Sequence, residues 1–269
     1  MAKPDRKLLK PERFLATVAY DGTDYSGWQV QKTGHSVEAE IEARLSRILK
    51  SDIDVHGSGR TDAGVHSVGQ RFHFDAFWPH PAKHLLLAFN ASEPKGLLIT
   101  DLRRVPAAFH CRFSARGKRY RYEIYEGWPS PFEARYCHDT RKRRLDVAAM
   151  SRAAKLLLGR HDFTAFGAMH GQGMESENPI KDLRRLDVRR KGPRITIVTE
   201  ASGYLYKMVR RLVGGLIRVG EGKLPPARLA AYRDERVISA EIPTAPARGL
   251  FMEKVLYDPR TLRPGVRSR

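Results

Sequence analysis

The chain has 269 residues, enough for one large or two small domains with a buried core, and its 49 Lys and Arg exceed its 30 Asp and Glu to give a formal charge of +19. An excess of this size predicts a polyanionic partner, because each basic contact to a phosphate releases counterions. No apolar run is long enough for a membrane-spanning helix, and the basic N-terminus lacks the apolar stretch of a signal peptide, so we expect a cytoplasmic protein with no membrane partner.

The first half of the chain predicts the element order β-α-β-β-α-β, which is that of a ferredoxin-like unit. Its first helix is well marked, since Ser36 is a suitable N-cap and Val37, Ile41 and Leu45 recur at helical spacing. The expected elements are, in order, a strand at 13–20, a helix at 36–50, strands at 53–56 and 68–74, a helix at 80–90 and a strand at 96–105.

The second half repeats this order of elements without any repeat of sequence. The expected elements are a strand at 112–126, a helix at 145–158 ended by Gly159, a hairpin of strands at 181–190 and 194–201, a helix at 204–219, a helix after Pro226 and a strand at 249–257. The fold class predicted is α+β, with two ferredoxin-like (RRM-like) units. The predicted domains are 13–106 and 107–258, with a basic tail at 1–12 and a disordered basic tail at 259–269.

Cysteine and histidine usage gives no sign of a metal centre. The cysteines, Cys111 and Cys137, form no C-x-x-C pair, and no histidine has the spacing of a metal ligand relative to another His, Cys or carboxylate. We therefore expect reduced thiols and no metal. The pair His161-Asp162 invites comparison with metal phosphohydrolases, but it stands alone.

Aromatic residues alternate with positive charges in 118–122 and 204–207. Because aromatic faces stack on bases, this pattern favours RNA over an acidic protein as the partner.

The stretch from Gly57 to His66 combines three glycines, one arginine and one carboxylate between two predicted strands. A loop of this composition is a good place to hold a catalytic group, and Asp62 is the candidate. The alternative is an ordinary turn, since Asp followed by small residues is common turn chemistry. An aspartic protease would need a second such turn, which the chain lacks.

Gly59-Arg60-Thr61-Asp62-Ala63-Gly64-Val65-His66, followed by Gly69-Gln70, resembles the active-site signature of the tRNA pseudouridine synthase A (TruA) family. Further stretches resemble the family in the same order, over residues 13 to 257: Tyr20-Asp21-Gly22, Gly27-Trp28-Gln29, Phe109-His110, Arg112-Phe113-Ser114-Ala115, Arg119-Tyr120-Arg121-Tyr122, Met208-Val209-Arg210 and Ala245-Pro246-Ala247-Arg248-Gly249-Leu250.

This resemblance implies an isomerase (an intramolecular transferase) that converts uridine to pseudouridine on the 3′ side of the tRNA anticodon stem-loop, at tRNA positions 38, 39 and 40. It implies two α/β domains that share an antiparallel sheet, with a basic active-site cleft between them, and a homodimer that binds tRNA. The reaction includes no redox change and no phosphate transfer, so no cofactor or metal is required. Asp62 is the implied catalytic residue. Three routes stay open for it: attack on the sugar, attack on the uracil ring, or removal of a proton.

Arg210 is the expected partner of Asp62, because a nearby cation keeps a carboxylate ionised. Within the predicted helix it shares an apolar or small face with Val213 and Ile217, so we expect it to point inward. Arg211 lies on the other side and is expected to point outward. The alternative for an inward arginine is a structural ion pair, and the family motif favours the partner of Asp62.

Tyr120 is the third catalytic candidate, by resemblance. A tyrosine above the ring can stack on uracil and take part in removal of the C5 proton, although a phenol is a weak base without help. On an alternating strand it faces the same side as Tyr122, so the alternative is a cross-strand aromatic.

Two further residues are candidates for substrate binding. Arg60 can fill the space left by the target base or hold a phosphate, and the alternative is a salt bridge that braces the loop. Leu250 is implied by resemblance to pack on uracil, and the alternative is a core leucine. The remaining motif residues are expected to be structural: Asp21, Trp28, Gln29, His66 and His110.

The chain departs from the family pattern at four places, Ser92-Glu93-Pro94, Cys111, Asn178-Pro179-Ile180 and Arg248. None of them is a candidate catalytic residue, so they bear on which RNA is bound. Two rival hypotheses therefore stay open. One is a noncatalytic RNA-binding or RNA-folding protein on the same scaffold, and the other is a pseudouridine synthase for a different RNA.

Overall fold

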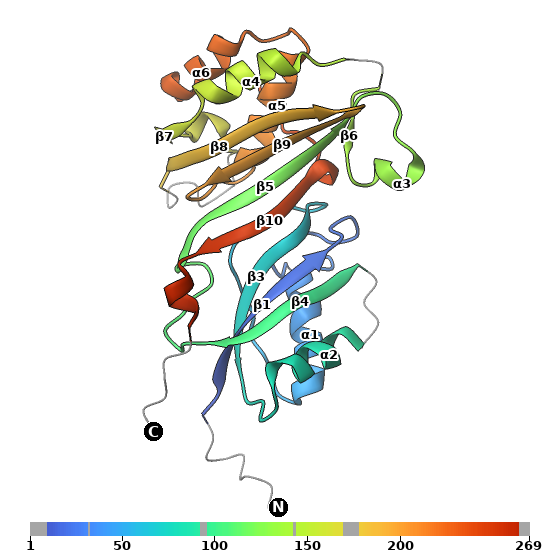
Figure 1. The fold of residues 1–269 in the computed structure, drawn as a ribbon, viewed down its shortest axis with the longest axis vertical. Helices are drawn as coiled ribbons and strands as arrows, with labels where there is room; N and C mark the ends of the chain where they lie inside the picture. The colour runs from blue at the N-terminus through green and yellow to red at the C-terminus, as the bar shows by residue number, and fades with distance from the viewer. Residues whose placement is uncertain (1–9, 32, 92–95, 142–143, 169–177, 264–269) are drawn as a thin grey trace, which may run out of the picture. The chain divides into compact units, whose positions relative to one another are not determined.

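The computed structural model describes residues 10–31, 33–91, 96–141, 144–168 and 178–263 of the chain (Figure 1). The chain forms two compact units: unit 1 comprises Met1–Ala115 and Val255–Arg269, and unit 2 comprises Arg116–Lys254. Helices and strands occur in both units, so the mixed α and β character expected from sequence is confirmed.

Unit 1 contains an antiparallel sheet with the strand order β4-β1-β3, and β2 pairs with β3. Its helices α1 and α2 cover one face of this sheet (Figure 1). The element bounds are β1 (Glu12–Tyr20), α1 (Val37–Leu49), β2 (His56–Gly57), β3 (His66–Ala76), α2 (Ala82–Ala91) and β4 (Leu97–Val105). The predicted element order of the first half is therefore observed.

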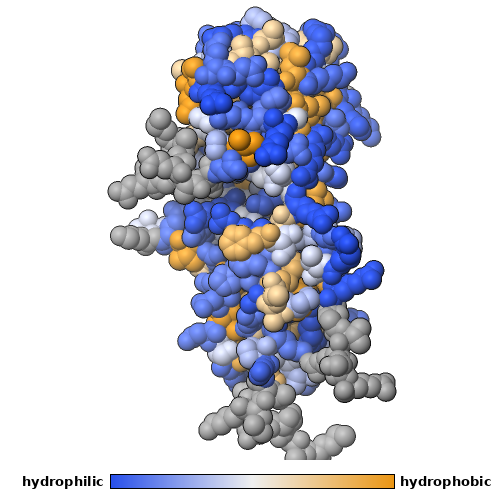
Figure 2. Space-filling model, turned by 90° about the vertical axis from the view of Figure 1, so that its left-hand side faces the viewer, coloured by the Kyte–Doolittle hydropathy of each residue, from blue (hydrophilic) through white to orange (hydrophobic). Residues whose placement is uncertain are grey.

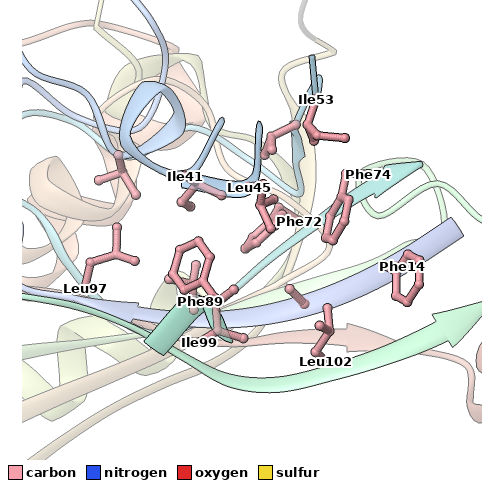
Figure 3. Close-up of a cluster of buried hydrophobic side chains, with 14 of the residues drawn as sticks. Phe14, Ile41, Leu45, Ile53, Phe72, Phe74, Phe89, Leu97, Ile99 and Leu102 are labelled. Atoms are coloured by element: carbon pink, nitrogen blue, oxygen red, sulfur yellow. The ribbon is translucent and has the colours of Figure 1, made fainter. Parts of the chain in front are cut away.

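The core of unit 1 lies between the sheet and the two helices. Phenylalanines of the sheet meet apolar residues of the helices, and all of them are fully buried (Figure 3). The members from the sheet and the two helices include Phe14, Phe72, Phe74, Ile41, Leu45 and Phe89. Burial of each such side chain contributes roughly 1.5–3 kcal/mol to folding.

Local chemistry sets the ends of α1. The Oγ of Ser36 accepts the backbone N–H of Ala39 at 3.2 Å, as expected of an N-cap, and Lys50 ends the helix in the left-handed region with φ 53°.

Residues 107–115 and 255–258, which we assigned to the second domain from sequence, group with unit 1. A second, small buried cluster explains this, because it joins that segment to β1 and β4; its members are Leu15, Val105, Phe109 and Cys111. Tyr257 packs against the cluster, and its hydroxyl donates to the carbonyl of Cys111 at 2.6 Å.

Unit 2 contains a sheet with the strand order β10-β5-β9-β8-β7, in which the neighbouring pairs β5–β9, β9–β8 and β8–β7 are antiparallel and the short β6 pairs with β5 in parallel. The element bounds are β5 (Ala115–Tyr125), α3 (Pro131–Ala134), β6 (His138–Asp139), α4 (Val147–Leu156), β7 (Gly159–Asp162), β8 (Ile180–Lys191), β9 (Arg194–Ala201), α5 (Met208–Gly220), α6 (Pro226–Glu235) and β10 (Leu250–Tyr257). The last three residues of β10 belong to unit 1.

Three local predictions for this half were wrong. Gly159 begins β7 instead of ending a helix. Helix α5 begins at Met208, not at residue 204, because Lys207 adopts φ 58° and the Tyr204 hydroxyl bonds to Thr199 Oγ1 at 3.1 Å. Residues Pro259–Leu262 form a 3-10 helix capped by Asp258, so this part of the expected disordered tail is ordered.

Within the described residues, no helix combines the length and apolarity needed to cross a bilayer. Most of the face in Figure 2 is hydrophilic, with hydrophobic residues in scattered groups, as the basic composition leads us to expect.

Candidate active site

The loop that carries Asp62 is anchored to β3 at its start. Ser58 is fully buried; its N–H donates to the Arg71 carbonyl at 2.7 Å, and its hydroxyl donates to Gln70 Oε1 at 2.6 Å. The amide nitrogen of Gln70 then donates to the Gly59 carbonyl at 2.6 Å. One buried glutamine therefore holds two consecutive loop residues.

The middle of the loop is anchored to the segment that follows β1. The Thr61 carbonyl accepts the N–H of Trp28 at 3.1 Å, and the Thr61 hydroxyl bonds to the Tyr20 hydroxyl at 2.9 Å. Gly27 adopts φ +106°, and a Cβ there would lie 2.6 Å from the Thr61 carbonyl oxygen. Only glycine fits this position, because both the backbone conformation and the close approach exclude a side chain.

The end of the loop is anchored by His66, which is buried. Its Nδ1 accepts the N–H of Gly22 at 3.1 Å and lies 3.1 Å from Oδ1 of Asp21. The indole of Trp28 donates to Glu38 Oε1 of α1 at 3.1 Å. The bracing roles expected of Asp21, Trp28 and His66 are therefore found in the structure.

Asp62 is half-buried and opens a turn of the loop. Its carbonyl accepts the N–H of Val65 at 3.1 Å, and Gly64 has φ +76°, as the third position of a type II turn requires. The ordinary turn that was the alternative interpretation of this stretch is thus present, and the same turn holds Asp62 in place. Arg60 is exposed.

Arg210 lies in the first turn of α5 and is half-buried. Its Nε donates to the Ala245 carbonyl at 2.7 Å, and its own carbonyl accepts the N–H of Ala245 at 3.0 Å. The two bonds tie the arginine to the segment just before β10, so the direction of the side chain is fixed by backbone.

The prediction that Arg211 points outward was wrong. Arg211 is buried, and its Nη2 donates to the Ser239 carbonyl at 3.1 Å. Burial lowers the pKa of its guanidinium. A helical pattern shows only which residues share a face, and here α5 packs against α4, α6 and the 3-10 helix at Thr164–Phe166, so more than one of its faces is buried.

Tyr120 and Tyr122 are both buried on β5, as their alternation predicted. The rings of Tyr120 and Tyr204 form a T-shaped pair, with centroids 5.2 Å apart and planes at 88°. Tyr122 donates to the Pro246 carbonyl at 2.9 Å, and burial raises the pKa of its phenol. Tyr122 therefore has a structural role, and Tyr204 is an aromatic neighbour of Tyr120 that the sequence reasoning did not pair with it.

The segment before β10 packs against the same strand. A Cβ at Gly249 would lie 2.8 Å from Tyr122 Cζ and from the Glu123 carbonyl, so only glycine fits. Leu250 follows and is buried. Burial fits both a core leucine and a leucine that packs on uracil. Arg248, a departure from the family pattern, donates to Asp139 at 2.7 Å and to the Cys137 carbonyl at 3.0 Å.

The candidate residues thus belong to two sets: Arg60 and Asp62 are in unit 1, and Tyr120, Arg210 and Leu250 are in unit 2. The supports that sequence reasoning missed are Tyr20, Thr61 and Ser58. Each lies in or beside a motif quoted for the family resemblance, but its partner is distant in sequence.

A family model described as tRNA pseudouridine synthase matches residues 16–114 and 153–258. The tRNA pseudouridine synthase A of Brevibacillus brevis is 41% identical over 251 residues, which cover 91% of this chain and 100% of that protein. The protein of the same name from Alcanivorax borkumensis is 39% identical over 249 residues, 91% of each chain. That from Geobacillus kaustophilus is 37% identical over 256 residues, 93% of this chain and 96% of that protein. The two segments matched by the family model include Arg60, Asp62, Arg210 and Leu250, whereas Tyr120 lies between them.

Proposed function

The chain belongs to the tRNA pseudouridine synthase family, and we infer that it is an isomerase that converts uridine in tRNA to pseudouridine. The reaction breaks the bond between uracil N1 and ribose C1′, rotates the base and joins its C5 to C1′. The hydrogen on C5 leaves as a proton and N1 gains one, so atoms balance without an oxidant or a phosphate donor.

Asp62 is proposed as the catalytic carboxylate. The observation that supports it is the bracing of the loop just before it: the side chains of Tyr20 and Gln70 and the amide of Trp28 hold Gly59 and Thr61. A group that must meet one atom of a rotating base gains from being held in a fixed geometry. Attack on C1′, attack on the uracil ring and proton removal are all open to a carboxylate so held.

Arg210 is proposed to keep Asp62 ionised. A guanidinium near a carboxylate favours its charged form, and the charged form is the one that attacks or accepts a proton. The bond from Nε to the Ala245 carbonyl supports this role, because it orients the guanidinium before substrate arrives.

Tyr120 is proposed to stack on the uracil and to assist loss of the C5 proton, and Leu250 to pack on the same base. The edge contact with Tyr204 sets the plane of the Tyr120 ring. Arg60, which is exposed, is proposed to bind the tRNA backbone or to enter the space left by the target base.

The substrate is proposed to be the 3′ side of the anticodon stem-loop, bound in the cytoplasm by a homodimer of two-domain, ferredoxin-like chains. The charge of +19 supports recognition through phosphates and RNA shape. Binding should therefore weaken steeply as salt concentration rises.

The substrate is tested by mapping pseudouridine in total RNA of cells that lack the gene. We expect the modification to disappear from the anticodon stem-loop and to return with the wild-type gene but not with Asp62→Asn. Loss at sites in another RNA would support a pseudouridine synthase with a different target. An unchanged map, with tRNA binding by the pure protein, would support the noncatalytic RNA-binding protein.

A further inference from the structure

Unit 1 brings together three metal-ligating side chains that are separated in sequence. We call His73, His110 and Cys111 the His–Cys cluster. One ligand atom from each residue lies within 4.8 Å of those of the other two. His73 comes from β3, and the other two come from the segment after β4, so the sheet and this segment bring together side chains whose spacing gave no sign of a site.

The thiol of Cys111 is at the centre of the cluster and is fully buried. Its Sγ lies 3.2 Å from Nδ1 of His73 and 2.9 Å from the His56 carbonyl oxygen. A thiol has one proton, so it can donate to only one of these acceptors at a time. The backbone N–H of Cys111 also points at His73 Nδ1, at 3.5 Å, which directs the lone pair of that nitrogen toward the cysteine.

The imidazoles are grouped closely. The ring centroids of His73 and His110 are 4.6 Å apart, and the exposed His56 lies 4.9 Å from His73 and 6.0 Å from His110. Arg13, whose charge acts on His73, is paired with Asp75 through two hydrogen bonds of 2.8 and 2.7 Å.

We propose that His73, His110 and Cys111 bind a zinc ion, with His56 or a water as the fourth ligand. A set of two imidazoles and one thiolate suits zinc, which prefers tetrahedral nitrogen and sulfur ligands. Binding releases the thiol proton to solvent and costs His110 the amide hydrogen bonds that its Nδ1 accepts from Arg112 and Phe113, at 3.2 and 3.4 Å. His110 is only half-buried, which gives the ion a path in.

The consequence of the ion is structural. His56 immediately precedes Gly57, where the Asp62 loop begins, and it pairs with His73 in the β2–β3 ladder. A metal here would join the segment after β4 to both strands that frame the loop. This inference does not depend on the proposed reaction.

The experiment titrates the full-length, chelator-treated protein with Co²⁺, because a thiolate bound to Co²⁺ gives a charge-transfer band in the near ultraviolet. We expect the band to saturate at one equivalent, to disappear when Zn²⁺ is added and to be lost in Cys111→Ala. The matched control is Cys137→Ala, which removes the other buried cysteine and should leave the band unchanged. The variant His110→Gln should weaken Co²⁺ affinity at least about tenfold.

Thermal melting gives a second measurement for the case in which Cys111→Ala folds poorly. Zn²⁺ should raise the melting temperature of the wild type and of Cys137→Ala, and not that of His110→Gln at the same concentration. The absence of a sulfur-to-cobalt band in the folded wild type, or a band that persists in Cys111→Ala, would overturn the proposal. The cluster would then be a hydrogen-bonded part of the core.

Discussion

The two sets of candidate residues are held in different ways. In unit 1, Asp62 lies on an irregular loop whose residues are held by side chains and amides outside the loop, chiefly those of Tyr20, Trp28 and Gln70. In unit 2, Arg210 lies on a regular helix and is oriented by one backbone carbonyl, that of Ala245. An irregular loop can hold a reacting group only if its neighbours supply the missing bonds. Changes to the supports in unit 1 should therefore act on turnover, and comparable changes in unit 2 should act on stability.

The largest effect on turnover is expected at Arg210 of α5, and the adjacent Arg211 provides its control. Arg210→Ala should lower kcat about 100- to 1,000-fold with little loss of folding, because it removes the cation proposed to keep Asp62 ionised. The control Arg211→Met should leave kcat near the wild-type value and destabilise the protein by about 1–3 kcal/mol, because it leaves the Ser239 carbonyl without its donor. Single-turnover kinetics and urea unfolding measure the two quantities. Full activity of Arg210→Ala would exclude the proposed ion pair.

The next largest effect is expected at Gly27, where a side chain would collide with the Thr61 carbonyl. Gly27→Ala should destabilise the protein by about 2–4 kcal/mol, and it should lower kcat about 10- to 100-fold through displacement of the Asp62 turn. Gly192→Ala is the matched control, since Gly192 also has a positive φ, of +60°, but a Cβ there meets no atom within 4 Å. It should cost about 1 kcal/mol of stability and leave kcat unchanged. Equal kcat values for the two variants would show that the turn does not need its support.

A smaller effect is expected from the hydroxyl of Tyr20. Tyr20→Phe removes the bond to Thr61 and should cost about 1 kcal/mol of stability and lower kcat by less than about tenfold. Tyr232→Phe removes the hydroxyl bond of another buried tyrosine, to the exposed Glu241, in unit 2 and should change stability without changing kcat. The comparison between the units fails if both variants lower kcat to the same extent.

The smallest effect is expected from the pH dependence of stability in unit 2. Burial lowers the pKa of His138 on β6, so the unfolded chain binds a proton there at a higher pH than the folded chain does. Stability should therefore be full above the ordinary histidine pKa of about 6.5 and should fall as the pH decreases below it. Urea unfolding of the wild type and of His138→Gln gives the free energy of unfolding at each pH in this range. The difference between the slopes of the two curves against pH is the contribution of His138. Parallel curves would show that His138 does not titrate on unfolding.

Elements with local signals were predictable from sequence. Ser36 caps α1 as its position indicated, and the hairpin strands β8 and β9 were located within a residue at each end. The two-residue β6 and the four-residue α3 and β7 were not predicted, because elements this short lack a periodic pattern.

Properties set by tertiary packing were not predictable. Arg211 was placed outward because a helical pattern shows which residues share a face, not how many faces are covered. The segment 107–115, which we assigned to the second domain, groups with unit 1, since Phe109 and Cys111 are buried with Leu15, nearly one hundred positions earlier. The His–Cys cluster was not predicted for the same reason, because its residues come from β3 and from the segment after β4, which are far apart in sequence.

The candidate site was recognised by its motifs, and its supports were not. Asp62 was selected by a glycine-rich signature, whereas the bond between Tyr20 and Thr61 joins residues 41 positions apart and leaves no local trace.

The measurement that tests the account most directly is the release of tritium from tRNA labelled at uridine C5, with tRNA binding measured in parallel. C5 loses its hydrogen only when the base is joined there to C1′. We expect release by the wild type, none above background by Asp62→Asn, and tRNA affinity of the variant within about threefold of the wild type, since the change removes one charge and keeps the shape of the side chain. Release by Asp62→Asn at the wild-type rate would contradict the account, because the carboxylate that the braced loop presents would then have no part in the reaction.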